Sequence, residues 1–536
     1  MHKEKYTLLV EDDSFHEGTV ALLDNQQILC ILENERVTKH KHAVFESNVT
    51  ETIDYIKRSY QIKDEDLNIV RGLNVRYPNH HELHATASYF SSGFDKASIL
   101  VIDNCGDADD CTTLFAGRGK DVFELKKYQR KNSLGLLYCV VASYLYDTPH
   151  SEGKMMGLSC CTEPEYNIPS PIQYHEDGTV ECIFEEREGY DLETNLLHYI
   201  TENFAYLIKS DGQVLEPDIY KAKIAATVQW WFTEQVINLV KYLKSLNPKT
   251  ENLCLCGGCF LNCETNGIID RLGLFKNIYC VPAPADNSTV LGRAQQTLIS
   301  FGAEPQVIKS PYLGPKHDTT KEELLNIFRI HVDENGKYKS DINCLHDIQD
   351  YSEEWVIERL KNNKPILWFD GESEYGPRAL GHRSFLANPA TNDMFWKLSV
   401  DIKSRENYRP LAPITTDELY PLIFDDPNPE NLTAFMLKTV KIKKEWHSSL
   451  RAVTHINQTA RPQRLTKDVN PTLYSLINRW YKETGLPCLI NTSLNLKNQP
   501  LLETYNDLKS LFVCKNVVRN CSIVVDHKLC LDLDLL

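Results

Sequence analysis

The sequence predicts an α/β protein, from a repeated strand pattern and one helical periodicity. Short apolar runs at Tyr6–Val10 and Ala97–Asp103 each lead into an acidic, glycine-containing turn and then into a second apolar run. Short apolar runs bounded by turn residues are typical of buried strands. The segment from Ala222 to Leu243 instead repeats apolar residues at the spacing of an amphipathic helix. The two copies of strand, turn and strand suggest duplicated halves in the first part of the chain.

The other elements of the first part follow in chain order. Thr19–Leu23 and Ile28–Leu32, joined through Asp24-Asn25, predict a hairpin with an Asx turn. Thr112–Ala116 predicts the strand that follows the second acidic turn. Leu253–Cys256 predicts another buried strand, which ends at a pair of glycines.

A polar stretch separates this part from the rest of the chain. From about Pro305 to Lys339 the sequence is rich in proline, glycine and charge, which places a domain boundary near residue 345. We therefore expect one domain over residues 1–345 and a second over residues 346–536. In the second domain, strands are expected at Ile366–Phe369, Cys488–Ile490 and Ile523–Val525.

Composition narrows the class of protein. A chain of 536 residues with 25% charged and 42% hydrophobic residues is globular and not disordered. Its net charge of −16 argues against a broad basic surface for nucleic acid. Acidic residues follow the first four apolar positions, and no window approaches a membrane span. With 17 cysteines, an odd number, we expect a cytoplasmic protein with reduced thiols and no membrane or nucleic-acid partner.

Two histidines and two aspartates form a candidate metal site. His80 and His84 are four residues apart, so on a helix both imidazoles face the same side. Taken singly, these two are also typical of a polar helix face, Asp103 of a strand end, and Asp286 of a helix N-cap. Together they suit a divalent ion such as Fe²⁺, Mn²⁺ or Zn²⁺ better than Mg²⁺ or Ca²⁺.

The acidic turns suggest a nucleotide cleft. EDDSFHEGTV, DNCGDADDCT and the pair Gly257-Gly258 would suit an actin-like cleft, where turns approach phosphates and glycines allow close approach to adenosine. The sequence contains neither a Walker-type GxxxxGK[ST] nor a GxGxxG motif.

A basic cluster lies in the second part of the chain. Residues 376–413 contain six lysines and arginines against three acidic residues. Lys403, Arg405 and Arg409 are spaced too irregularly for a helix stripe, and they suit a loop that lines an anionic pocket. Arg461 has the same surroundings, and Ser493 and Asn495 follow a predicted strand. The alternative interpretation is a solvated basic surface with salt bridges.

These stretches resemble the NodU/CmcH-type O-carbamoyltransferases of nodulation-factor and antibiotic biosynthesis. The matching stretches keep the family's order over roughly residues 10 to 505, most of the chain. They are FHEGTVALL, HHELHATASYF, SILVIDNCGD, SLGLLY, EGKMMGLS, LCLCGGCFLNCETNG, PAPADNSTVLGRA, GESEYGPRALGHRS, IKSRENYRPLAP, VTHINQTARPQ and TGLPCLINTSLN.

The resemblance implies a fold and a reaction. The N-terminal domain would be similar to the ASKHA (actin/Hsp70-like) transferases that make threonylcarbamoyl-adenosine, and the C-terminal domain would be YrdC-like. The C-terminal domain would join carbamoyl phosphate and ATP, with Mg²⁺, into carbamoyladenylate. The N-terminal domain, carrying iron (Fe²⁺) or another divalent transition metal, would transfer the carbamoyl group to the hydroxyl of a small-molecule acceptor.

The resemblance also assigns residues. His80, His84, Asp103 and Asp286 match the metal ligands, and His16 matches a candidate general base. Lys403 and Arg409 match catalytic positions of the adenylation pocket. The substrate and nucleotide ligands would be Gly257, Gly258, Asn262, Arg378, Lys403, Arg405, Arg409, Arg461, Ser493, Asn495 and Lys497.

The chain departs from the family's pattern at two places. After His16 the family usually has Asp-Ala or Asp-Ser, and this chain has Glu17-Gly18. After the last signature the family usually has Arg-Gly-Glu-Pro, and this chain has Lys497-Asn498-Gln499-Pro500. Lysine lacks the bidentate fork of arginine, and the absence of glycine at 498 bears on the backbone of the loop.

Two other functions stay open. A tRNA-modifying threonylcarbamoyl-type enzyme would favour a basic RNA surface, against which the net charge of −16 counts. A non-catalytic actin-like ATP-binding protein would explain the acidic turns but neither the basic cluster nor the His/Asp set. The sequence does not name the acceptor or the metal, and it leaves open whether the chain forms an oligomer.

Overall fold

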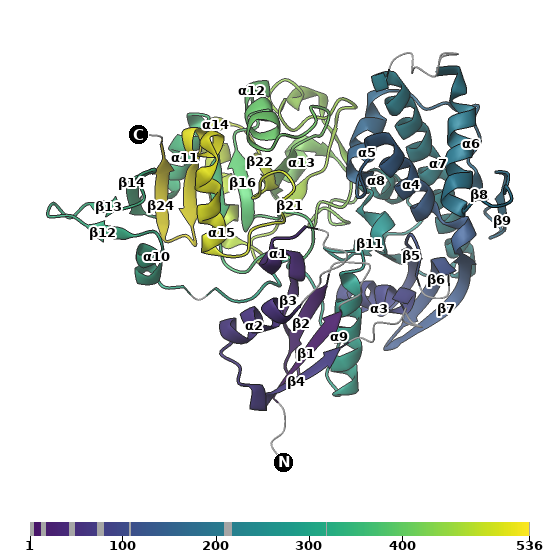
Figure 1. Ribbon diagram of the computed structural model, residues 1–536, viewed down its shortest axis with the longest axis horizontal. Coiled ribbons are helices and arrows are strands. Elements are labelled where there is room, and N and C mark those ends of the chain that lie inside the picture. The colour runs from purple at the N-terminus through teal and green to yellow at the C-terminus, as the bar shows by residue number, and fades with distance from the viewer. Residues whose placement is uncertain are drawn as a thin grey trace.

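The computed structural model describes residues 5–11, 18–41, 49–71, 80–106, 109–207, 217–317 and 319–534. In Figure 1 the first strands (purple) lie at the foot of the molecule, a group of helices (blue to teal) lies at the upper right, and the last sheet (green and yellow) lies at the upper left.

The first sheet has the order β3-β2-β1-β4. Its strands are β1 (Tyr6–Glu11), β2 (Thr19–Leu23), β3 (Ile28–Glu33) and β4 (Leu67–Arg71). β1 and β2 are antiparallel, β2 and β3 are antiparallel, and β1 and β4 are parallel. The predicted hairpin is confirmed, with Asp24 Oδ1 accepting from the amides of Gln26 and Gln27 at 2.8 Å.

The second sheet has the order β11-β10-β5-β6-β7. Its strands are β5 (Lys96–Ile102), β6 (Asp110–Arg118), β7 (Asp121–Gln129), β10 (Asn252–Cys256) and β11 (Asn277–Cys280). β5 pairs antiparallel with β6, β6 antiparallel with β7, and β5 parallel with β10. This succession of directions repeats that of the first sheet, in agreement with the predicted duplication.

Two helices lie between the sheets. They are α3 (His80–Ser92) and α9 (Ser288–Ser300). Ala87 and Leu291 join the apolar cluster of the first sheet, and Tyr89 joins that of the second. The helices approach closely at Gly292, where a Cβ atom would lie 2.1 Å from the carbonyl oxygen of Leu83. The far face of the first sheet is covered by α2 (Thr50–Ser59), which follows the short α1 (Asn34–Thr38).

A helical group covers the second sheet. It comprises α4 (Leu134–Tyr146), α5 (Glu152–Leu158), α6 (Leu192–Asn203), α7 (Pro217–Leu246) and α8 (Cys263–Arg271), with the small hairpin of β8 (Ile172–Tyr174) and β9 (Val180–Cys182). The predicted helix over Ala222–Leu243 lies within α7, and its apolar positions, such as Ile224 and Trp231, are buried. Among the described residues, no helix has the length and apolarity that a membrane crossing needs.

The last sheet has the order β14-β24-β23-β15-β16-β22-β17-β21. Its strands are β14 (Leu345–Asp350), β15 (Ile366–Phe369), β16 (Arg383–Ala387), β17 (Ala412–Thr416), β21 (Gln463–Leu465), β22 (Leu489–Ser493), β23 (Ser522–Val525) and β24 (Leu529–Leu533). The predicted strand Ile366–Phe369 is confirmed with its bounds. The strand predicted from Cys488 begins one residue later and extends to Ser493.

Helices cover both faces of this sheet. One face packs against α11 (Glu353–Lys361) and α14 (Pro471–Thr484), and the other against α12 (Asn392–Phe395), α15 (Tyr505–Ser510) and α16 (Lys515–Asn520). The remaining elements are α10 (Lys321–Ile327), β12 (Ile330–Val332), β13 (Tyr338–Ser340), α13 (Tyr420–Ile423), β18 (Phe424–Asp425), β19 (Val440–Ile442) and β20 (Thr459–Ala460). A π-helical turn, Trp396–Ile402, follows α12 and leads into the loop that carries Lys403, Arg405 and Arg409.

Candidate functional site

The four residues of the candidate metal site come together between the two N-terminal sheets. His80 and His84 lie on the first turns of α3, Asp103 follows β5, and Asp286 precedes α9. The two Nε2 atoms lie 3.1 Å apart. His84 Nε2 lies 3.2 Å from Asp103 Oδ2 and 3.7 Å from Asp286 Oδ1. One ligand atom from each residue falls within 4.8 Å of all the others, so the set is confirmed as a group that could hold a metal ion.

Neighbouring side chains orient this cluster. His84 Nδ1 lies 2.7 Å from the hydroxyl of Ser288, which also lies 3.3 Å from the thiol of Cys256. A hydrogen bond from Nδ1 to Ser288 would leave the lone pair on Nε2, which lies toward the other ligands, as metal-ligating histidines require. Gly258 lies close, since a Cβ there would be 3.3 Å from Asp103 Oδ1. The sequence analysis missed Ser288 and Cys256, although Ser288 stands two residues after Asp286.

The charges of the cluster favour a cation. Burial lowers the pKa of His80, but the carboxylates of Asp103 and Asp286 outweigh burial and raise it to about 9. Asp103 Oδ2 is buried and accepts no hydrogen bond from the described part of the chain. A buried carboxylate oxygen in that state, aimed at two imidazole nitrogens, fits a divalent transition metal. The donor set does not select among Fe²⁺, Mn²⁺ and Zn²⁺.

The adjacent His81 has a different environment. Its Nδ1 lies 2.7 Å from Thr113 Oγ1, and burial lowers its pKa to about 3. Its ring also fills the space beside Gly106, where a Cβ would come within 2.8 Å. His81 therefore packs against β6 and stays neutral.

Lys403 is the buried centre of the second cluster. It follows the π-helical turn, with 2% of its surface exposed. Its ammonium group donates to Asn495 Oδ1 at 2.7 Å, to the Asn495 carbonyl at 2.9 Å, and to both the carbonyl and the hydroxyl of Ser493. Burial lowers the pKa of Lys403 well below its usual range, and the charges of Arg405 and Arg409 lower it further.

Four arginines form a cluster with this lysine: the charges of Arg405 and Arg409 act on Lys403, and Arg378 and Arg461 lie near those two arginines. Arg405 donates to Thr492 Oγ1 at 3.2 Å and to Ser493 Oγ at 3.1 Å. Burial, followed by the charges of Arg409 and Arg461, lowers the pKa of Arg405. Burial and the charge of Arg461 act on Arg378 in the same direction. Arg378 Nε is buried and makes no hydrogen bond within the described residues. Such a concentration of positive charge, and an unused buried donor, is typical of a site for a polyanion.

The turn after β22 shows how the chain accommodates its departure from the family's pattern. Asn498 adopts φ +62°, in the left-handed region, where asparagine is tolerated better than most residues other than glycine. Gln499 Oε1 accepts from the Leu496 amide at 3.1 Å, and Asn495 Nδ2 donates to the Gln499 carbonyl at 2.7 Å. The turn therefore holds Asn495 against Lys403, while the side chain of Lys497 is exposed.

Comparison with known proteins shows the family to which this chain belongs. A model described as the carbamoyltransferase N-terminus matches residues 68–295, and one described as the carbamoyltransferase C-terminus matches residues 357–525. The nodulation protein NolO of Bradyrhizobium diazoefficiens is 30% identical over 444 residues, which cover 81% of this chain and 76% of the relative. This chain belongs to the carbamoyltransferase family.

A second relative of this carbamoyltransferase matches nearly its whole length. The 3'-hydroxymethylcephem-O-carbamoyltransferase of Amycolatopsis lactamdurans is 24% identical over 545 residues, which cover 94% of this chain and 95% of the relative. The His/Asp cluster lies within the N-terminal family match, and Lys403 with its four arginines lies within the C-terminal one.

The other residues assigned from the sequence have separate environments. Gly257 adopts φ +98°, and a Cβ there would lie 2.2 Å from the Ile102 carbonyl, so the glycine is needed for the approach to β5. Asn262 caps α8, accepting from the Thr265 amide, and it also exchanges hydrogen bonds with Gln229. The Asn262 side chain is therefore engaged both in capping α8 and in hydrogen bonds with Gln229. His16 lies outside the described residues.

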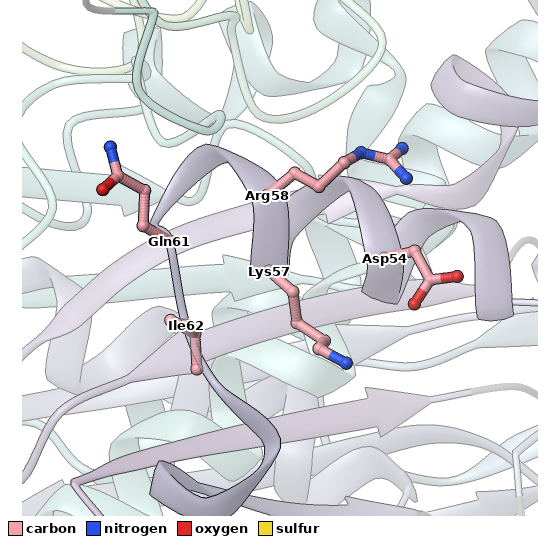
Figure 2. Close-up of a pocket in the computed structure, with 5 residues that line it drawn as sticks. All are labelled: Asp54, Lys57, Arg58, Gln61 and Ile62. Carbon is pink, nitrogen blue, oxygen red and sulfur yellow. The ribbon is translucent and has the colours of Figure 1, made fainter.

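A hollow on the surface of α2 is separate from both clusters. Figure 2 shows Asp54, Lys57, Arg58, Gln61 and Ile62 around it, with the polar ends pointing in different directions. Lys57 pairs with Asp64 on the exposed surface. Side chains that diverge in this way do not converge on a ligand, so the hollow is not a candidate active site.

Proposed function

We propose that this protein is an ATP-dependent O-carbamoyltransferase that works in two steps. In the first, carbamoyl phosphate, water and ATP give carbamoyladenylate, phosphate and pyrophosphate. In the second, the acceptor hydroxyl attacks the carbamoyl carbon, and AMP leaves. The observation that carries the proposal is the arginine cluster around Lys403, because joining two polyanions requires concentrated positive charge that is already in place.

The first step would use the second half of the chain. Arg378, Arg405, Arg409 and Arg461 would neutralise the phosphates of both substrates, with Mg²⁺ accompanying ATP. Within the described residues Arg409 pairs with Glu406 through one guanidinium nitrogen at 3.5 Å, so its guanidinium remains available to an anion. Lys403, held by Ser493 and Asn495, would contribute a charge at the floor of the pocket. Water would first release phosphate from carbamoyl phosphate to give carbamate, and a carbamate oxygen would then displace pyrophosphate from the α-phosphorus of ATP.

The second step would use the His/Asp cluster. A divalent transition metal held by His80, His84, Asp103 and Asp286 would supply Lewis-acid polarisation of an oxygen of the intermediate. Ser288 would hold the His84 imidazole in the tautomer that leaves Nε2 free. His16 remains our proposed general base for the acceptor hydroxyl, on the family resemblance alone.

The same proposal includes the type of each domain, the class of acceptor and the cellular location. We assign residues 1–345 to an ASKHA-like carbamoyl-transfer domain, supported by the repeated sheet order, and residues 346–536 to a YrdC-like domain. Because the cephem carbamoyltransferase is named for a small-molecule acceptor, we propose a small-molecule hydroxyl here too. The cytoplasm is the proposed location, as the cysteine usage predicts.

Two variants separate the steps. Pyrophosphate release from ATP, dependent on carbamoyl phosphate, is measured without acceptor for the wild type, Arg461→Met and His84→Asn. We expect Arg461→Met to reduce release by at least about tenfold, the scale of one lost charged contact. We expect His84→Asn to retain release and to lose bound metal. Unchanged release in Arg461→Met, from protein that unfolds at the wild-type temperature, would contradict the assignment of the first step.

A further inference from the structure

One buried ion pair joins the two clusters of the site. Glu33 ends β3 and Arg36 lies in α1, with side chains 3% and 2% exposed and Arg36 Nε 2.9 Å from Glu33 Oε2. Glu33 Oε1 accepts from the amide of Gly376 at 2.6 Å, and Arg36 Nη2 donates to the carbonyl of Gly376 at 2.6 Å. Both backbone polar groups of Gly376 are therefore held by the same pair. Gly376 stands two residues before Arg378 of the arginine cluster.

The same segment contacts the loop that carries Asp286. Tyr375 is fully buried, and its hydroxyl donates to the carbonyl of Asn287 at 2.8 Å. Asn287 Nδ2 also lies 3.5 Å from Glu33 Oε1. One carboxylate oxygen thus contacts the segment that leads to Arg378 and the residue between Asp286 and Ser288.

The backbone at Gly376 shows how close this contact is. Its φ is +103°, and a Cβ there would lie 2.7 Å from the Pro282 carbonyl oxygen and 3.0 Å from Ala283 Cβ. Because Pro282 and Ala283 lead directly into the loop of Asp286, the two loops touch without an intervening side chain. A shift of either loop would therefore be transmitted to the other.

We propose that Glu33, held by Arg36, is a positioning residue that fixes the Arg378 segment relative to the metal-ligand loop. This inference rests on the proposed function, which assigns anion binding to one loop and metal binding to the other. Glu33 touches neither ligand. It acts through the backbone of Gly376 and the side chain of Asn287, so its loss moves both binding groups together.

The test compares Glu33→Ala with a matched control. Asp270→Asn alters another buried carboxylate, 2% exposed, whose partner Lys438 lies 2.6 Å away in the second half of the chain. Two probes are titrated separately: Co²⁺ into metal-free protein, and inorganic pyrophosphate into metal-free protein. The unfolding temperature of each variant is measured alongside.

We expect Glu33→Ala to weaken both affinities by about tenfold, the scale of lost outer-shell support. Asp270→Asn should lower the unfolding temperature and leave both affinities within about twofold of the wild type, since it lies outside the shared contact. Glu33→Gln keeps an acceptor for the Gly376 amide, so it should recover most of the pyrophosphate affinity. Tyr375→Phe, which removes one hydroxyl, tests the same link if Glu33→Ala does not fold, and it should weaken Co²⁺ binding.

Three results overturn the inference, and they differ. If the wild type binds neither probe, the proposed function fails and the inference fails with it. If the wild type binds both probes and folded Glu33→Ala, or Tyr375→Phe in its place, binds them equally well, the proposed function stands and Glu33 has no positioning role. Equal weakening of both affinities by Asp270→Asn would show a general effect of destabilisation and would also overturn it.

Discussion

At the scale of single residues, Lys403 and Arg378 share one property: their surroundings disfavour the positive charge of the side chain. Lys403 is buried and Arg378 is partly buried, and within the described part of the chain neither forms an ion pair with a carboxylate. Burial and neighbouring arginines lower the pKa of both side chains. A structural ion pair would not produce this arrangement, because its carboxylate would raise the pKa of the cation. The missing negative charge is best supplied by a substrate.

The lowered pKa of Lys403 predicts proton uptake when a polyanion binds. In the free protein the pKa of Lys403 is depressed, and a bound polyanion raises it. Between these two pKa values binding takes up a proton. Affinity for pyrophosphate is therefore greatest below the pKa of the free protein and falls as the pH rises through the pKa of the complex. Calorimetric titration in buffers of different ionisation enthalpy measures this uptake.

Lys403→Met supplies the control for the same titration, because pyrophosphate itself also exchanges protons with the buffer. We expect the variant to bind more weakly and to take up fewer protons than the wild type. An identical proton uptake in both proteins would show that Lys403 does not titrate on binding.

At the scale of elements, the turn after β22 keeps a left-handed residue at position 498, although this chain has asparagine there in place of glycine. Asn498 takes the left-handed conformation at the position where the family usually has glycine. Within the turn, the Leu496 amide donates to Gln499 Oε1, and Asn495 Nδ2 donates to the Gln499 carbonyl. Asn495 in turn accepts from Lys403, so the backbone of this turn sets the position of the buried charge.

Substitution of Asn498 tests this role. Asn498→Gly should change the free energy of unfolding by less than about 1 kcal/mol, since glycine adopts the same conformation. Asn498→Val should lower it by about 1–2 kcal/mol, the cost of a left-handed conformation for an L-residue, and should weaken pyrophosphate binding. Denaturant unfolding and the pyrophosphate titration measure both effects. Wild-type behaviour of Asn498→Val would mean that the turn does not position Lys403.

Local sequence signals predicted some of the strands but not their partners. Tyr6–Val10, Ile366–Phe369 and the residues of α7 were predictable because apolar runs and helical periodicity are visible within a few residues. The His/Asp set could be assembled because His80 and His84 have helical spacing and the family resemblance added both aspartates.

Contacts between distant segments could not be predicted in the same way. Arg36 and Gly376 are 340 positions apart, and no periodicity links them. Ser288 also looks like an ordinary helix-start residue until the fold brings it to His84. The residues that support the site are therefore brought together only by the tertiary structure. The proposed ligands, in contrast, lie in local motifs that the sequence shows.

At the scale of the whole molecule, the first and second halves meet through several buried polar contacts. Besides the Glu33–Arg36 pair, Lys438 of the second half reaches Asp270 of α8, and Asn431 Oδ1 accepts from the Ile278 amide at 3.1 Å. The contacts of Lys438 and Asn431 pack the second half against α8 and β11, whereas the Glu33–Arg36 pair contacts the segments that lead to the two clusters. In Figure 1 α1 lies next to α15 of the second half, and Lys39 at the end of α1 forms an ion pair with Asp507 of α15.

The central claim is that this carbamoyltransferase forms carbamoyladenylate itself. The most direct measurement incubates the wild-type protein, with its metal restored, with ATP, Mg²⁺ and isotope-labelled carbamoyl phosphate, and examines the adenylates by mass spectrometry. The account predicts an AMP derivative that carries the labelled carbamoyl group and is formed together with pyrophosphate. Folded, metal-loaded protein that forms neither the labelled adenylate nor pyrophosphate would contradict it.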